Sequence, residues 1–110
     1  RGASMYRARA DEAMLFDAVL SGQNTNLQHA SFCQAKAARA LFVQALAQKA
    51  DFGKAELSDA KFCGAMLAEA SFVEAVAPNA DFSKAQMGSA KLCGATLTEA
   101  SFAEAAASKV

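Results

Sequence analysis

The feature that most constrains this chain is an alanine at every fifth position, with a large apolar residue two places after it. In the stretch ADFGKAELSDAKFCGAMLAEASFVE, Ala50 precedes Phe52 in this way, and the spacing repeats as far as Phe72. A helix places residues five apart roughly 140° from one another, so the pattern would form no buried stripe. A flat strand alternates its faces, so an odd period would point successive phenylalanines to opposite sides. A unit of five that always buries the same two positions must turn by a constant amount at every repeat, which describes a coil.

The repeat resembles the pentapeptide-repeat family, whose consensus is A(D/N)LXX. From Thr25 onward the spacing is unbroken, and residues 3–20 follow it in another phase, so two extra residues near 23–24 shift the repeat. The resemblance implies an all-β fold, a right-handed quadrilateral β-helix with four pentapeptides in each coil. In the family, the central residue of each unit and the residue two before it point inward. Residues 1–110 are expected to form a single pentapeptide-repeat domain, a solenoid of about five coils.

A second period supports the square cross-section. Phenylalanines recur every ten residues from Phe32 to Phe82, which is half a coil, so large rings are expected on two opposite sides. Smaller central residues such as Ala37, Ala47 and Leu57 stand between them. Alternation of large and small side chains is what a narrow and densely packed interior requires.

Composition excludes several classes of protein. Eleven basic and eleven acidic residues cancel, so no charged patch is indicated for nucleic acid or for a membrane surface. No apolar run approaches the length of a membrane span. Three cysteines, Cys33, Cys63 and Cys93, do not suit a disulfide framework, so free thiols and a cytoplasmic location are expected. The chain begins with Arg1 rather than Met, which leaves open a fragment of a larger bacterial protein, including a secreted effector.

No set of residues indicates catalysis, a metal ion or a cofactor. His29 is the one histidine and has no matched serine or acid with which to form a nucleophile and base. His29 and Cys33 lie four residues apart, but a metal site needs three or four ligands at matched spacing. The stretch FGK at 52–54 lacks the glycine spacing of a phosphate-binding loop. We therefore expect no enzyme activity, no cofactor, and no catalytic, metal-binding or cofactor-binding residues.

The outward apolar residues are the strongest functional signal in the sequence. Coils of four units place Val19 and Leu41 in one outward column, and Leu46 and Met66 in the next. Contiguous exposed apolar surface marks a contact, whereas scattered exposed apolar residues are common. Both readings are left open, as is a docking site for a terminal helix that the chain lacks. The candidate interaction patch consists of Val19, Leu41, Val43, Leu46 and Met66.

These observations favour a non-enzymatic interaction or scaffold module with an unidentified protein partner, and a spacer without specific contacts is left open. The family resemblance implies an alternative, because its quinolone-resistance members mimic B-DNA and bind DNA gyrase. Zero net charge disfavours this alternative, since imitation of two phosphate backbones requires a strong negative potential. The resemblance also permits a homodimer through an exposed end coil, residues 100–110, where Ala105, Ala106 and Ala107 allow close approach.

Overall fold

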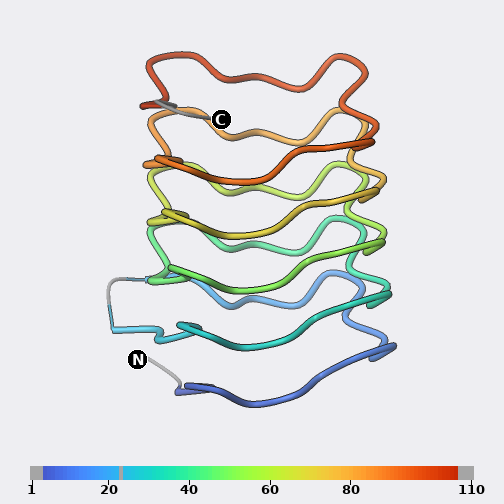
Figure 1. Ribbon diagram of the computed structural model, residues 1–110, viewed down its shortest axis with the longest axis vertical. Coiled ribbons are helices and arrows are strands. Elements are labelled where there is room, and N and C mark those ends of the chain that lie inside the picture. The colour runs from blue at the N-terminus through green and yellow to red at the C-terminus, as the bar shows by residue number, and fades with distance from the viewer. Residues whose placement is uncertain (1–3, 23, 107–110) are drawn as a thin grey trace.

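The computed structural model describes residues 4–22 and 24–106, which form a right-handed β-helix with four-sided coils (Figure 1). Within these residues there is no helix, and each β contact is an isolated parallel bridge between single residues. The bridge ladder that begins at Ser4 returns once per coil and ends at Ala106, so the chain completes five coils. The longest dimension is 27 Å, and the other two are 23 and 20 Å. The predicted quadrilateral β-helix is confirmed.

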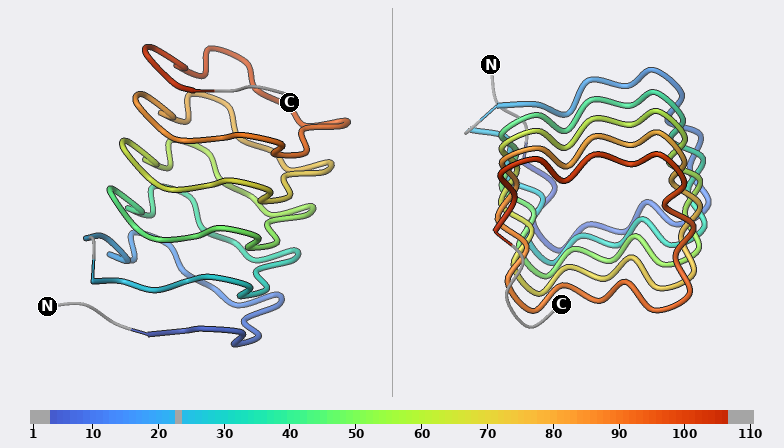
Figure 2. Two further views of the ribbon diagram at one scale, coloured as in Figure 1. Left: turned by 60° about the vertical axis from the view of Figure 1, so that its left-hand side comes forward. Right: turned by 90° about the horizontal axis from the view of Figure 1, so that it is seen from above.

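Four bridge ladders define four faces, which surround a rectangular cross-section (Figure 2). The first face carries Ser4, Asn26, Leu46, Met66, Gln86 and Ala106. The second face carries Arg9, Ser31, Asp51, Ser71 and Lys91. The third face carries Met14, Lys36, Glu56, Val76 and Thr96. The fourth face carries Val19, Leu41, Lys61, Asp81 and Ser101.

The corner at residues 21–25 is wider than the others. Ser4 pairs with Asn26, 22 residues later, whereas later partners such as Asn26 and Leu46 lie 20 residues apart. The hydroxyl of Thr25 donates to the carbonyl of Ser21 at 2.5 Å, so the wide corner is closed by a satisfied, buried hydroxyl. Thr25 therefore occupies the inward position that alanine takes in the other units. Residues 1–3, 23 and 107–110 lie outside the described ranges, and these include Ala3 of the predicted repeat, Gln23 of the predicted phase shift and Ala107 of the predicted end coil.

Every corner contains a tight turn, which produces the period of five. In the unit around Phe32, the N–H of Ala35 donates to the Phe32 carbonyl at 3.0 Å, and Gln34 has a φ of 62°. A positive φ at the third residue is the signature of a type II turn, and it recurs at this position in every described unit. On the flat sides, central residues bond to the next coil, as where the Phe32 N–H donates to the carbonyl of Asp51 at 2.7 Å.

One amide in each unit, that of the residue after the central one, has no backbone acceptor within the described residues. A polar side chain two positions earlier accepts it in four units, where that residue is Asn26, Asp51, Ser71 or Asp81. Asp51 Oδ1 accepts from the N–H of Gly53, and Asp81 Oδ1 from that of Ser83, both at 2.9 Å. This gives a physical reason for Asp or Asn in the consensus, because that side chain satisfies a donor that the ladder leaves free. Pro78 stands at the same position, where its missing N–H costs no ladder bond.

Two interlocking stacks of phenylalanine, on the second and fourth faces, fill the interior. Phe62 stacks on Phe42 and Phe82 with ring centroids 4.6 and 5.0 Å away. It meets Phe52 and Phe72 of the opposite stack edge-on, at 5.4 and 5.5 Å. Parallel stacking along the axis and edge-to-face contact across it are both favourable arrangements of aromatic rings. The predicted placement of large rings on two opposite sides matches this core.

Two rings in one coil leave room for a single further large side chain. In the third coil Leu57 accompanies Ala47, and in the fourth coil Leu67 accompanies Ala77, all of them buried. The leucine alternates between the third and first faces, which keeps the interior filled at constant width. At the two ends, the inward hydrophobic side chains are only partly buried because one neighbouring coil is missing, as in Met5, Leu15, Leu20, Leu92, Leu97 and Phe102.

Candidate interaction surfaces

The candidate patch lies across the corner between the fourth and first faces. Val19 pairs with Leu41 in one ladder, and Leu46 pairs with Met66 in the other, so the structure brings both pairs together. Val19 is 68% exposed and Met66 is 37% exposed. The other three members, Leu41, Val43 and Leu46, are half-buried, because coils above and below cover much of each side chain. The patch is therefore less exposed than the sequence pattern predicts.

The corner that joins the two halves of the patch carries Gln44 in one coil and Gly64 in the next. Gly64 has no side chain and a φ of 67°, and Gln44 Cγ lies 3.3 Å from the position that its Cβ would take. Below this corner, the amide of Val43 donates to Ser21 Oγ at 3.1 Å, which holds the backbone of the fourth face.

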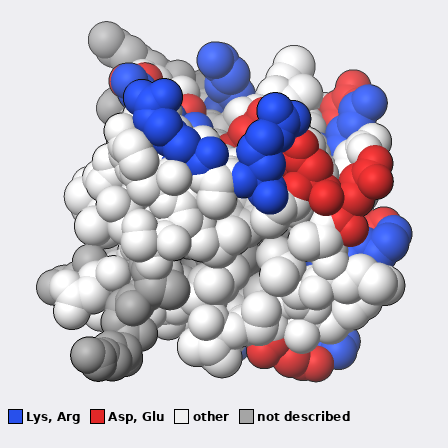
Figure 3. Space-filling model, turned by 90° about the horizontal axis from the view of Figure 1, so that it is seen from below, with Lys and Arg blue, Asp and Glu red and all other residues white. Residues whose placement is uncertain are grey.

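The first coil carries a group of exposed hydrophobic side chains that the patch prediction did not include. Their exposed fractions are 49% for Tyr6, 70% for Met14 and 46% for Phe16. The ring of Tyr6 meets that of His29 edge-on at 5.8 Å, and the Arg7 guanidinium lies 5.3 Å from its centroid. Viewed from below, the end formed by the first coil is largely uncharged, and charged side chains gather toward its rim (Figure 3). The phase of the N-terminal units could have revealed this group, because it places all three side chains outward.

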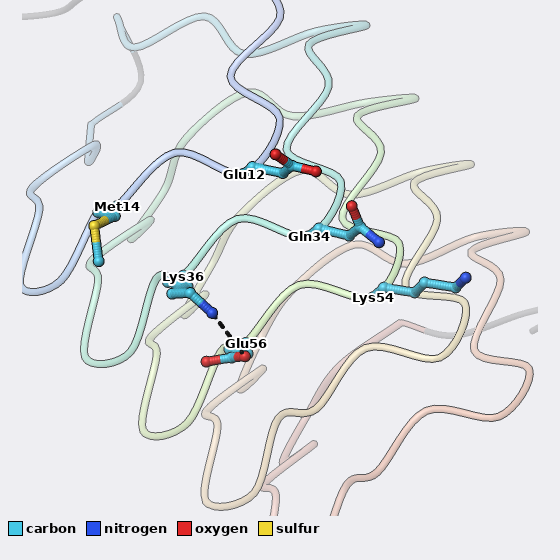
Figure 4. A pocket seen from close by; sticks show the side chains of 6 residues that line it. All are labelled: Glu12, Met14, Gln34, Lys36, Lys54 and Glu56. Atoms are coloured by element: carbon cyan, nitrogen blue, oxygen red, sulfur yellow. Dashed lines mark hydrogen bonds and ion pairs between the residues drawn. The ribbon is translucent and has the colours of Figure 1, made fainter.

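A groove of about 510 Å³ runs beside the corner between the second and third faces (Figure 4). Its charges cancel, because Glu12 and Glu56 stand with Lys36 and Lys54. Lys36 Nζ and Glu56 Oε2 form an ion pair at 3.3 Å. The groove is also lined by Met14 and Gln34. Ion-paired lysines and carboxylates on a solvated surface are poor acids, bases and nucleophiles, so this groove offers no evident reactive group.

Two of the three cysteines, Cys33 and Cys63, are half-buried, and Cys93 is exposed. Burial raises the pKa of the Cys33 thiol, and burial together with the nearby Asp81 carboxylate raises that of Cys63. A raised pKa lowers the fraction of thiolate, which is the nucleophilic form. In the part of the chain that the structure describes, no three or more His, Cys, Asp or Glu side chains are grouped so as to hold a metal ion. His29 is exposed and contacts Tyr6 rather than Cys33.

Four ion pairs join charged side chains of successive coils. Arg39 Nε lies 2.8 Å from Asp17 Oδ1, and the same guanidinium donates a second bond to that carboxylate. The Arg39 guanidinium lowers the pKa of Asp17. Further up the corners, lysines of the third coil pair with glutamates of the fourth, in Lys49–Glu69 and Lys54–Glu74. Positive and negative charges therefore alternate along the rod instead of forming continuous stripes.

A family model described as pentapeptide repeats matches the chain in eight copies, over residues 25–62, 55–92 and 79–110. A solved structure of trypsin-treated QnrB1, a plasmid-mediated fluoroquinolone resistance protein, is similar with a TM-score of 0.84 and 24% identity, over 93% of this chain and 51% of that one. The present chain thus spans about half the length of that protein.

A second solved structure is HetL from the cyanobacterium Nostoc sp. strain PCC 7120, a pentapeptide repeat protein involved in heterocyst differentiation regulation. It shares 26% identity over 88% of this chain and 41% of that one, with a TM-score of 0.43. No curated protein matches the sequence. No helix in the described residues is long and apolar enough to cross a membrane. The repeat, the four-sided coils and the family match over most of the chain together show that the chain belongs to the pentapeptide-repeat family.

Proposed function

We propose that this chain is a non-enzymatic protein–protein interaction module whose partner binds the first coil and the adjoining patch. The observation that carries the proposal is the uneven distribution of exposed large hydrophobic side chains. Four of them belong to the first coil, while residues 86–106 expose none. Exposed apolar surface concentrated in one region is typical of a contact site. The four residues are Tyr6, Met14, Phe16 and Val19.

A scaffold role also suits the shape and chemistry of the molecule. Each face is built from rigid, hydrogen-bonded ladders, which hold outward side chains at regular spacing. The open groove with paired charges and the thiols with raised pKa values support a function without catalysis. Three free thiols suit a reducing compartment, so a cytoplasmic location is part of the proposal.

The test is a binding experiment with a charge-balanced variant. Val19→Lys with Leu41→Glu places a glutamate between the new lysine and Lys61 in the same ladder, so each new charge has a partner. The control, Val76→Lys with Thr96→Glu, makes the same alternation above Glu56 on the third face. The parent chain is immobilised, bound proteins from a bacterial lysate are identified, and the affinity of each one is then measured for all three chains.

We expect a partner whose affinity falls at least tenfold for the fourth-face variant and is unchanged for the control, which is a loss of about 1.4 kcal/mol. Equal binding of the partner by both variants would place the contact elsewhere on the molecule. If no protein binds saturably, the result would favour a spacer without specific contacts.

The alternative role, a DNA mimic that binds gyrase, has an electrostatic requirement that this surface does not favour. The likeness to QnrB1 concerns the fold, and formal net charge here is zero. Coil-to-coil pairs such as Arg39 with Asp17 remove the negative stripes that would imitate phosphate backbones. Protection of gyrase from a fluoroquinolone in a supercoiling assay would favour the mimic over the interaction module.

A further inference from the structure

The junction between the first coil, residues 4–22, and the second coil, residues 25–44, is built differently from the junctions above it. The two phenylalanine stacks end in the second coil, at Phe32 and Phe42. Ala10 and Leu20 occupy the same inward positions one coil below. At each higher junction at least one pair of rings stacks in parallel, with centroids 4.6 to 5.1 Å apart. The first junction therefore lacks the aromatic contact that joins the other coils.

Polar side chains take the place of the rings at this junction. Ser31 Oγ and the amide of Cys33 both donate to Asp11 Oδ1, the amide at 3.2 Å. Arg39 donates to both carboxylate oxygens of Asp17, at 2.8 and 3.1 Å. Among the described residues, each higher junction carries at most one hydrogen bond between side chains. We call Asp11 and Asp17 the latch carboxylates. Such contacts on a solvated surface add little net stability, because water replaces them when they open.

The connection between the two coils is also different. In every other corner of the described residues, the amide of the inward residue donates to the carbonyl of the preceding central residue, as Ala35 does to Phe32. At the wide corner, the amide of Thr25 donates instead to the carbonyl of Gly22 at 2.9 Å, which leaves the Leu20 carbonyl out of the turn. Gly22 has a φ of 108°, a conformation that glycine adopts without strain. The wide corner is therefore a point about which the first coil can turn.

We propose that the rod opens at this junction, with the first coil turning away as one unit about the wide corner while residues 25–106 stay folded. Proteins open locally in cooperative units that follow structural boundaries. The last coil is the natural comparison, because its inward side chains are likewise only partly buried. There, however, Phe102 stacks on Phe82 at 5.1 Å. The first junction is therefore the weaker of the two and opens first.

Opening changes what the molecule presents to its surroundings. It separates Val19 from Leu41, which pair across this junction in the closed rod. It also uncovers one face of Phe32 and of Phe42, which the closed rod buries. The closed rod thus presents the candidate patch, and the open rod presents the end of the aromatic core. The opening is a property of the chain alone and does not depend on the proposed interaction module.

Hydrogen exchange of backbone amides in the whole chain, followed by NMR, measures the opening. Three amides of the second coil donate to carbonyls of the first coil, and three amides of the fourth coil donate to carbonyls of the last coil. The protection of the first set reports the first junction, and that of the second set reports the last junction. The first set is Ser31, Lys36 and Leu41, and the second set is Phe72, Ala77 and Phe82.

We expect the three amides of the first set to share one protection factor, about tenfold lower than that of the second set, which corresponds to the loss of one ring stack. Equal protection of the two sets would overturn the proposal. Unequal protection within the first set would also overturn it, because the first coil would then fray residue by residue instead of opening as a unit.

A double variant, Asp11→Ala with Asp17→Ala, tests the latch carboxylates. It should lower the protection of the first set by about a further fivefold and leave the second set unchanged. The control, Glu69→Ala, removes the ion pair with Lys49 at a higher junction and should leave the first set unchanged. If the double variant lowered both sets equally, or neither, the two carboxylates would not be what holds the first coil in place.

The opposite variant, Ala10→Phe with Leu15→Ala, should close the junction. It gives the first coil the alternation of Phe32 and Ala37 in the second, and so extends one ring stack by a coil. We expect the protection of the first set to rise by at least about twofold. Circular dichroism and a cooperative melt check that the variant is folded. A folded variant without this rise would contradict the inference that missing rings make the junction weak.

Discussion

Replacement of Phe62 by alanine is the sharpest test of how this fold is held together. Phe62 is fully buried and touches four other rings, two stacked at 4.6 and 5.0 Å and two edge-on at 5.4 and 5.5 Å. Removal of a buried phenylalanine costs about 3–5 kcal/mol through lost burial and the cavity left behind. Each aromatic pair adds about 0.5–1.5 kcal/mol beyond burial. We therefore expect a loss of about 5 kcal/mol for Phe62→Ala, at the upper end of the range.

Urea denaturation followed by circular dichroism measures this loss. With a slope of about 1–3 kcal/mol per molar of urea, the midpoint should fall by about 2 M or more. Phe102→Ala is a graded comparison, because Phe102 stacks on Phe82 alone, at 5.1 Å, and is partly exposed. It should cost about 1–2 kcal/mol.

Phe16→Ala is the control for the inward and outward assignment. Phe16 is 46% exposed and makes no ring stack in the core, so its removal should cost less than about 1 kcal/mol. If Phe62→Ala and Phe16→Ala lowered the midpoint equally, the interlocked rings would not be the source of stability, and the core described above would be wrong.

Three further tests address the surface and the core. Hydrogen bonds from Ser83 hold the pKa of Asp81 below its ordinary value of 3.8. The ionised Asp81 carboxylate therefore stabilises the folded state above pH 3.8, and this stabilisation is lost as the pH falls through the lower pKa of the folded protein. We expect the drop in Tm on acidification to be smaller in Asp81→Asn than in the parent chain. Cys93 is exposed, whereas the thiols of Cys33 and Cys63 are half-buried and have raised pKa values. Ellman's reagent at pH 8 should therefore react with Cys93 first, and Cys93→Ser should remove the fast phase of the labelling reaction. Met66→Asn should cap the free amide two residues later and raise the free energy of unfolding by about 0.5–1 kcal/mol in urea, whereas an unchanged midpoint would contradict the capping role.

The coil and its inward residues could be read from the sequence because both are local. The type II turn and the alternation of inward and outward positions are completed within five residues, so the sequence of each unit determines its own backbone and the directions of its side chains. The ten-residue spacing of phenylalanine then placed rings such as Phe52 and Phe62 on opposite sides. The ladders of the candidate patch followed from the same count, so the pairing of Val19 with Leu41 needed no further information.

The exposure and grouping of outward residues were decided only in three dimensions. Residues 20 or 22 positions apart become neighbours, and the coils above and below then shield a side chain such as Leu41 or leave it open. Tyr6 and Phe16 are exposed because no described coil lies beneath the first one, whereas Gln28 and Ala38, at the same positions one coil up, are half-buried between two coils. The uncharged ladder of the first face, from Ser4 to Ala106, likewise forms only when widely separated units are stacked. The repeat thus determined the backbone and the core through local turns and spacing, and the stacking of coils decided the surface, because a surface is made by neighbours that the sequence keeps far apart.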